Sequence, residues 1–200
     1  AGKTTTVRML TTLLRPTVEL SVTPPMWFAY RLRGAGLPLE RALGDGRSQP
    51  PRFVTLKPTL RCNLRCEFCR FVANGDVFGK RDWLEIDDWK RVIDEIAPYQ
   101  PYLCLTGGEP TIYPHLPELL RHINGHRLRS VLTTNGTLLE QRAEALMASP
   151  PTLVILSLDG PRAVHDAVRK QAGTYDRALR GARALQALRK NPFQPYLMLG

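Results

Sequence analysis

The chain has 200 residues, of which 43% are hydrophobic, as expected for one soluble globular domain with a short appendage. Its net charge is +10, but arginines are spread along the chain without a block of five like charges, so we predict no nucleic-acid partner. There is no run of about 18 apolar residues and no signal-peptide core, which excludes a spanning helix and predicts a cytoplasmic protein without a membrane partner.

Residues 1–20 are predicted to form one helix. Gly-Lys-Thr at residues 2–4 is the end of a phosphate-binding loop, and the apolar periodicity that follows it ends at Pro16. Residues 1–17 resemble the second half of the Walker A loop and the first helix of an ABC-transporter ATPase. Because the glycine and strand that would precede such a loop are missing, we expect a remnant of an ATPase, or a chance match, that binds no ATP.

Residues 21–52 are rich in Pro, Gly and Arg, and we interpret them as a linker or lead-in segment. From residue 53 onward, apolar runs alternate with amphipathic helical patterns. The predicted strands are 53–56, 102–106, 130–134, 153–158 and 196–199. The predicted helices are 89–96 with Asp87 as N-cap, 116–123, 138–147 and 175–188.

This alternation predicts an α/β fold with a parallel sheet. Polar or glycine-rich clusters follow four successive strands, at the edge where α/β barrels place their sites. We therefore predict a partial (β/α) TIM-like barrel rather than an open doubly wound sheet. Because the sequence stops at about the fifth strand, we expect the domain 53–200 to be incomplete at its C-terminus.

Three of the chain's four cysteines, Cys62, Cys66 and Cys69, lie together after the first strand. Thiolates are the soft ligands that hold iron–sulfur clusters and zinc. Three ligands on one short loop cannot surround a tetrahedral ion or a four-iron cube. Either a fourth ligand comes from elsewhere, or one position stays open for chemistry.

The other potential ligands are interpreted as structural. Cys104 lies inside an apolar run and is predicted to be a core residue. The histidines have no shared spacing that indicates a ligand set, and we interpret all four as surface or structural residues: His115, His122, His126 and His165.

Two further motifs accompany the cysteines: Gly107-Gly108-Glu109-Pro110 after the second strand and Ser157-Leu158-Asp159-Gly160 after the fourth. The combination resembles the radical S-adenosylmethionine (radical SAM) enzymes over about residues 53–200. It is most similar to the branch that contains the molybdenum-cofactor cyclase and the SPASM-type peptide and protein maturases. Details typical of that branch are Thr133-Thr134-Asn135-Gly136, His165, Asp166 and Arg169.

The resemblance implies an oxidoreductase-type enzyme in which the three cysteines bind a [4Fe–4S] cluster. S-adenosylmethionine (SAM) would chelate the fourth iron, and one-electron reduction would release a 5′-deoxyadenosyl radical that abstracts hydrogen from a substrate. The substrate would be a peptide, a cofactor precursor or another small molecule. An external reductant of the flavodoxin or ferredoxin type is implied as a partner, and no catalytic side chain is identified.

The resemblance also implies which residues bind SAM. It places Gly107–Glu109 at the methionyl amino group and Phe68 near the adenine. Ser157 would contact polar groups of SAM, and Asn135 is a further candidate, although Asn-Gly is also a common turn. Two residues either shape the SAM site or pair structurally: Asp159 and Arg169.

Two other interpretations stay open. The chain is a truncated, inactive radical SAM fragment if the missing strands are needed to close the substrate pocket. It is a structural zinc module if the three cysteines and one histidine complete a zinc site, although zinc sites commonly use paired Cys-x2-Cys knuckles and no second pair occurs.

Overall fold

The computed structural model describes residues 51–69, 84–190 and 195–200. The predicted ATPase-like helix and almost all of the predicted linker lie outside the described residues. Pro50–Gly200 form one compact unit, and the predicted domain limits stay a prediction.

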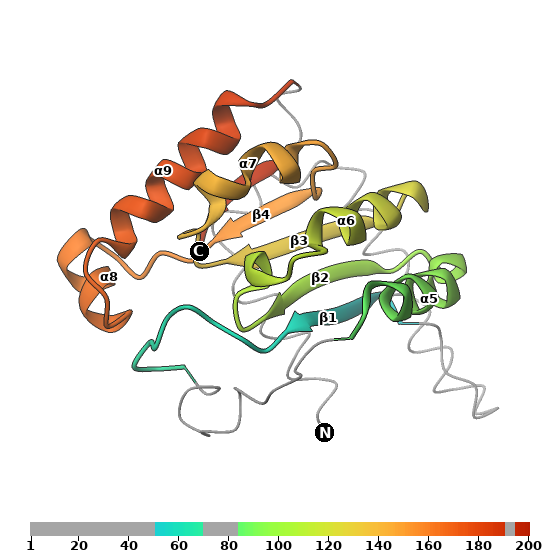
Figure 1. Cartoon of the computed structure of the whole chain (residues 1–200), viewed down its shortest axis with the longest axis horizontal. Coiled ribbons are helices and arrows are strands. Elements are labelled where there is room, and N and C mark those ends of the chain that lie inside the picture. The colour runs from blue at the N-terminus through green and yellow to red at the C-terminus, as the bar shows by residue number, and fades with distance from the viewer. Residues whose placement is uncertain (1–50, 70–83, 191–194) are drawn as a thin grey trace, which may run out of the picture. The chain divides into compact units, whose positions relative to one another are not determined.

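A sheet of five parallel strands forms the centre of this unit, and its strand order follows the sequence (Figure 1). The strands are β1 (Phe53–Thr59), β2 (Tyr102–Gly107), β3 (Arg129–Thr134), β4 (Leu153–Leu156) and β5 (Tyr196–Leu199). The helices are α5 (Ile86–Ile96), α6 (Leu116–Gly125), α7 (Leu139–Met147), α8 (Arg162–Val168) and α9 (Thr174–Ala187). Two short 3-10 turns are η1 (Ala97–Tyr99) and η2 (Pro110–Ile112). The predicted α/β fold, a partial TIM-like barrel, is confirmed.

The core lies between the sheet and the helices that cover one of its faces. Leu103 and Leu105 of β2 are fully buried, and they pack with Ile93 of α5 and Leu119 of α6. Full burial of each such side chain contributes roughly 1.5–3 kcal/mol. Cys104 lies between the two leucines of β2 and is only half-buried. Because side chains alternate between the faces of a strand, it points away from this core, and its prediction as a core residue is wrong.

One helix begins earlier than predicted, and one helix was not predicted. The first predicted helix begins at Ile86, and its N-cap is Glu85 rather than Asp87. Asp87 instead lies in the first turn, where an acidic side chain is favoured by the positive end of the helix dipole. Helix α8 was not predicted because seven residues are too few for an apolar period to stand out.

Asp166 connects α8 to the following helix. Its carboxylate accepts hydrogen bonds from the Gly173 and Tyr175 backbone N–H groups and from the Thr174 hydroxyl, at 2.7, 2.9 and 2.7 Å. These hydrogen bonds lower the pKa of Asp166 to about 2. The bonds satisfy donors in the first turn of α9 and thereby fix the turn between the two helices.

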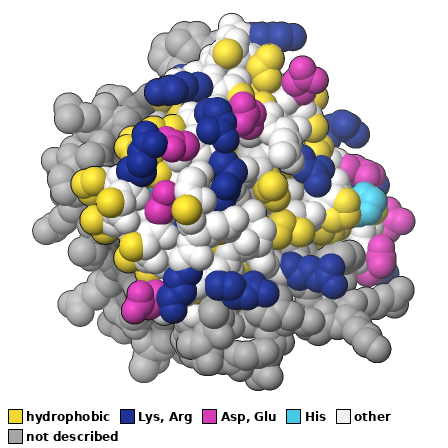
Figure 2. All heavy atoms as spheres, turned by 60° about the vertical axis from the view of Figure 1, so that its left-hand side comes forward, with side chains coloured by type: hydrophobic (Ala, Val, Ile, Leu, Met, Phe, Trp, Pro, Cys, Tyr) yellow, Lys and Arg dark blue, Asp and Glu magenta, His cyan; other side chains and the backbone are white. Residues whose placement is uncertain are grey.

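The charged side chains are mixed on the face that Figure 2 shows, which includes the side on which α8 and α9 lie in Figure 1. Lys and Arg side chains are spread over it and alternate with Asp and Glu (Figure 2). In the described part of the chain, no helix is both long and apolar enough to cross a membrane.

Candidate functional site

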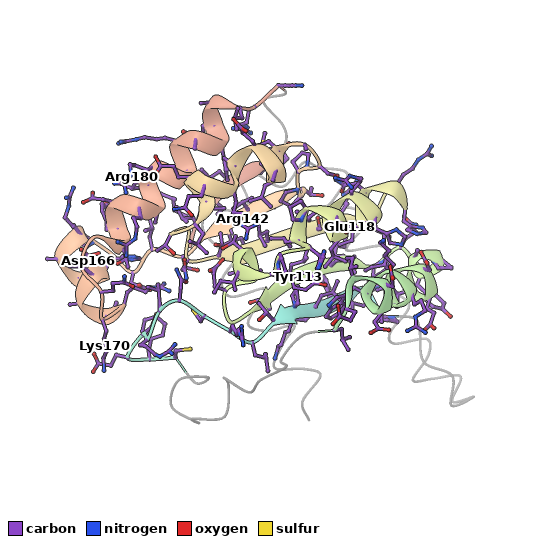
Figure 3. The ribbon with its side chains drawn as sticks, viewed as in Figure 1. Tyr113, Glu118, Arg142, Asp166, Lys170 and Arg180 are labelled. Carbon is purple, nitrogen blue, oxygen red and sulfur yellow. The ribbon has the colours of Figure 1, made fainter. Side chains whose placement is uncertain are left out.

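The cysteine loop, residues 60–69, follows β1 at the carboxyl edge of the sheet. On one side, the Glu67 N–H donates to the Val168 carbonyl of α8 at 2.9 Å. On the other side, the Glu109 N–H donates to the Arg61 carbonyl at 2.7 Å. Leu64, in the middle of the loop, is only 2% exposed and provides an apolar anchor. In Figure 3, Lys170 and Asp166 mark the α8 end of the molecule beside this loop.

Two glycines at the end of β2 let the cysteine loop approach closely. Gly107 has a φ of +121°, and a Cβ there would lie 2.4 Å from the Thr59 carbonyl oxygen. A Cβ on Gly108 would lie 2.1 Å from the Arg61 carbonyl oxygen. No side chain fits at either position, so these glycines place the backbone at the start of the loop. Their predicted contact with SAM stays a prediction.

Cys62 lies against the end of β3. Its Sγ accepts hydrogen bonds from the Leu64 backbone N–H at 3.5 Å and from the Asn135 Nδ2 at 3.9 Å. The same Asn135 amide donates to the Asn63 Oδ1 at 2.9 Å, and Asn63 in turn donates to the Thr137 hydroxyl at 2.8 Å. Asn63 and Thr137 were not predicted as site residues. They are 74 residues apart in the sequence, and only the folded structure shows the hydrogen bond between them.

Cys66 is buried and lies beside a cationic side chain. The Arg169 Nη1 lies 3.7 Å from the Cys66 Sγ, and the guanidinium also forms a forked pair with Asp159 at 2.6 and 3.0 Å. Burial raises the pKa of the Cys66 thiol, whereas the Arg169 charge acts in the opposite direction. Arg169 therefore places a fixed positive charge beside this sulfur, and Asp159 orients it. Asp159 and Arg169, which were expected either to shape the SAM site or to pair structurally, form a pair directly at the cysteine loop.

His165 contacts the Asp159 member of the Asp159–Arg169 pair. It is fully buried, and its Nδ1 accepts from the Asp159 backbone N–H at 3.3 Å. Burial lowers the pKa of His165, and the charge of Arg169 lowers it further. The imidazole is thus packed against Asp159 through this hydrogen bond, in agreement with the prediction of a structural histidine.

Glu109 joins the ends of β2 and β3. It is 1% exposed, and its Oε1 accepts from the Thr111 N–H and hydroxyl and from the Thr134 hydroxyl, at 3.0, 2.5 and 2.7 Å. Its Oε2 accepts from the Asn135 N–H at 2.7 Å. Burial raises the pKa of Glu109, and these hydrogen bonds oppose that shift. The carboxylate therefore holds Asn135 in place, and the predicted contact of Glu109 with the SAM amino group stays a prediction.

The remaining predicted residues lie at the same edge. Phe68 is 61% exposed, and the Arg169 guanidinium lies 5.3 Å from its ring centroid. Ser157 is half-buried, and its N–H donates to the Thr134 carbonyl at 2.9 Å. Cys69 is half-buried, and its N–H donates to the Cys66 carbonyl at 3.2 Å. The edge thus combines three free thiols, N–H donors directed at two of the sulfurs and a buried cation, a donor set that fits a thiolate-bound iron–sulfur cluster.

The sequence from residue 56 to residue 200 matches the radical SAM superfamily. The chain belongs to this superfamily. Radical SAM proteins are enzymes that use a [4Fe–4S] cluster and SAM, so the predictions of enzyme class and cofactors are confirmed at the level of the family.

Two curated relatives come from Methanosarcina barkeri. The chain is 38% identical over 146 residues to an AdoMet-dependent heme synthase, covering 72% of this chain and 40% of the relative. It is 37% identical over 130 residues to an Fe-coproporphyrin III synthase, covering 64% of this chain and 32% of the relative. The chain therefore spans two fifths or less of the length of these relatives.

The solved structure of Streptococcus suis SuiB bound to S-adenosylmethionine has a similar fold. Its TM-score with this chain is 0.62 at 17% sequence identity, and the match covers 91% of this chain and 44% of that chain. At this identity, the similarity is one of fold.

Proposed function

We propose that this chain is the cluster-binding part of a radical SAM enzyme, with Cys62, Cys66 and Cys69 as the three protein ligands of a [4Fe–4S] cluster. When bound, such a cluster supplies an electron for the reductive cleavage of SAM to a 5′-deoxyadenosyl radical, which abstracts hydrogen from the substrate. The observation that carries the proposal is a loop with three free thiols at the carboxyl edge of the sheet, with the Arg169 guanidinium against the Cys66 sulfur.

The other residues at this edge have complementary roles in the proposal. Arg169 and the Asn135 amide stabilise negative charge on the sulfurs of Cys66 and Cys62. Glu109 fixes the position of Asn135 through the backbone. The proposed SAM-binding residues are those that the sequence indicated: Phe68, Gly107, Gly108, Glu109, Asn135 and Ser157.

The substrate that the relatives favour is a tetrapyrrole-type cofactor precursor. The two M. barkeri relatives that support this choice are 37% and 38% identical to the chain, whereas the likeness to SuiB supports only the fold. The molybdenum-cofactor cyclase and SPASM-like branch remains our proposal for the wider grouping. The proposal also includes a flavodoxin-type or ferredoxin-type reductant and a location in the cytoplasm, where thiols stay reduced.

Anaerobic reconstitution with iron and sulfide tests the proposed function. We expect a brown protein with about four irons per chain that forms 5′-deoxyadenosine from SAM when dithionite is added. A colourless protein that retains a single zinc would contradict the proposal and support the structural zinc module. A brown protein that leaves SAM intact would support the inactive-fragment interpretation instead.

Replacing Arg169 with glutamine should lower the reduction potential of the reconstituted cluster. Reduction adds negative charge beside Cys66, and the fixed positive charge of Arg169 stabilises it. We expect a decrease of about 60 mV, which corresponds to a tenfold change in the equilibrium constant of a one-electron couple. A redox titration followed by electron paramagnetic resonance measures this potential.

The matched variant for this measurement is Arg169→Lys. It keeps the charge but loses the forked pairing with Asp159, so its potential should lie between those of the wild type and Arg169→Gln. Equal potentials for all three proteins would show that Arg169 does not tune the cluster.

A further inference from the structure

Three side chains converge at the C-terminal ends of two helices, away from the cysteine loop. The Asp94 Oδ1 of α5 lies 2.7 Å from the Nε2 of His122 and 2.7 Å from the Nε2 of His126. One ligand-type atom from each of the three residues lies within 4.8 Å of the other two. Since α5 and α6 run back from the carboxyl edge, their last turns lie at the opposite edge of the sheet (Figure 1).

The spacing of the two histidines explains how they meet. His122 lies in the last turn of α6 and His126 is its C-cap, so they are four residues apart and share one side of the helix. Their ring centroids are 5.0 Å apart. Helix α5 packs against α6 and contributes Asp94. The interpretation that the histidines share no ligand spacing is therefore wrong for this pair, because the spacing is visible in sequence and only the carboxylate comes from a distant position.

Two helix ends and a carboxylate favour a cation here, against the positive charges of Lys90 and Arg121 at the same pocket. The negative ends of two helix dipoles, those of α5 and α6, lie close to Asp94 and His126. The neighbouring Lys90 ammonium is paired with the Glu118 carboxylate at 2.7 Å and with Asp87 at 3.4 Å, which offsets its charge. Figure 3 shows Glu118 on α6.

The three side chains are also accessible to an ion from solvent. Their exposed fractions are 52% for Asp94, 27% for His122 and 36% for His126. Both histidines border a surface pocket, which provides space for water beside an ion bound there. The pocket is lined by Lys90, Glu118, Arg121, His122, Gly125 and His126.

We propose that Asp94, His122 and His126 form a binding site for a divalent transition-metal ion of the Zn²⁺ type. Imidazole nitrogen and carboxylate oxygen are ligands that Zn²⁺ takes in proteins, and solvent completes the four positions. Without an ion, each Nε2–H donates to the Asp94 carboxylate. In the proposed site the ring proton moves to Nδ1, so that the Nε2 lone pair binds the ion in place of that hydrogen bond. The bound ion clamps the last turns of α5 and α6 together, independently of the cysteine loop.

Cobalt titration of the untagged chain tests this site, because Co²⁺ reports its ligands in the absorption spectrum. Ions on the cysteine thiolates give an intense sulfur-to-cobalt charge-transfer band, whereas ions on nitrogen and oxygen ligands give only weak visible bands. We expect the wild type to bind one cobalt ion on nitrogen and oxygen ligands, with weak visible bands. His122→Gln and Asp94→Asn should each weaken that binding by about tenfold or more and leave the charge-transfer band unchanged.

The matched control is His115→Gln, since His115 lies at the other end of α6 with its side chain 44% exposed. This variant should bind cobalt as the wild type does, both on the cysteine thiolates and on the nitrogen and oxygen ligands. Zn²⁺ should raise the thermal midpoint of the wild type and of His115→Gln more than that of His122→Gln or Asp94→Asn. The proposal is wrong if the wild type binds cobalt only with the charge-transfer band. It is also wrong if His122→Gln and Asp94→Asn bind cobalt as well as His115→Gln does. In either case the three side chains form only a hydrogen-bonded group.

Discussion

Replacing Cys66 with alanine should abolish both cluster assembly and the formation of 5′-deoxyadenosine. Cys66 is the central cysteine of the loop, it is 6% exposed, and its sulfur is the one next to the Arg169 guanidinium. Removing it leaves two of the three proposed thiolate ligands, and no other cysteine is available in the loop to replace it. The measurements are iron per chain after anaerobic reconstitution and chromatographic quantification of 5′-deoxyadenosine.

Cys104→Ala is the matched control, because it removes the one cysteine that lies outside the loop. Cys104 is half-buried on β2, so the variant should bind as much iron as the wild type and cleave SAM equally well. Reductive cleavage of SAM by the Cys66→Ala protein would refute the proposed ligand set.

Replacing Gly108 with alanine should displace the cysteine loop. The new Cβ would lie 2.1 Å from the Arg61 carbonyl oxygen and 2.4 Å from that of Leu60, and both are backbone atoms that cannot rotate away. Overpacking of this kind typically lowers the free energy of unfolding by about 1–3 kcal/mol. We also expect a reduced iron content, because the loop that carries the thiols begins at this contact. Chemical denaturation and iron analysis measure the two effects.

Gly125→Ala provides the comparison for that experiment. A Cβ on Gly125 meets no atom within 4 Å, and the residue lies at the end of α6. Alanine there should leave iron binding unchanged and raise the free energy of unfolding by about 0.4–1 kcal/mol, because it restricts the unfolded chain. Identical denaturation midpoints and iron contents for the Gly108 variant and the wild type would contradict the close approach.

The sequence predicts the sheet well because its signals are local. Continuous apolar runs mark β2, β4 and β5, and the polar motifs that follow the strands identify the functional edge. The cysteine spacing and the Gly-Gly-Glu-Pro motif also define the chemistry that the family uses. Helix α8 escaped prediction because its seven residues carry no apolar period.

The contacts that complete the site could not be predicted, because they join side chains that are distant in sequence. Arg169 was expected either to shape the SAM site or to pair structurally, but its contact with Cys66 depends on how α8 is placed. Glu109 was expected to face a ligand, yet its main partners are protein groups at the end of β3. Residue type and spacing indicate what a side chain can do, whereas its orientation is decided by tertiary packing.

The sequential order of the strands has a consequence for synthesis on the ribosome. Because β1 to β5 add to the sheet in the order in which they are made, each strand finds its neighbour already in place. The cysteine loop emerges early, however, and the arginine that pairs with Cys66 follows 103 residues later. A nascent chain therefore carries the three thiols without this cation while the next 103 residues are made, so we expect delivery of iron and sulfide to be most effective after α8 has emerged.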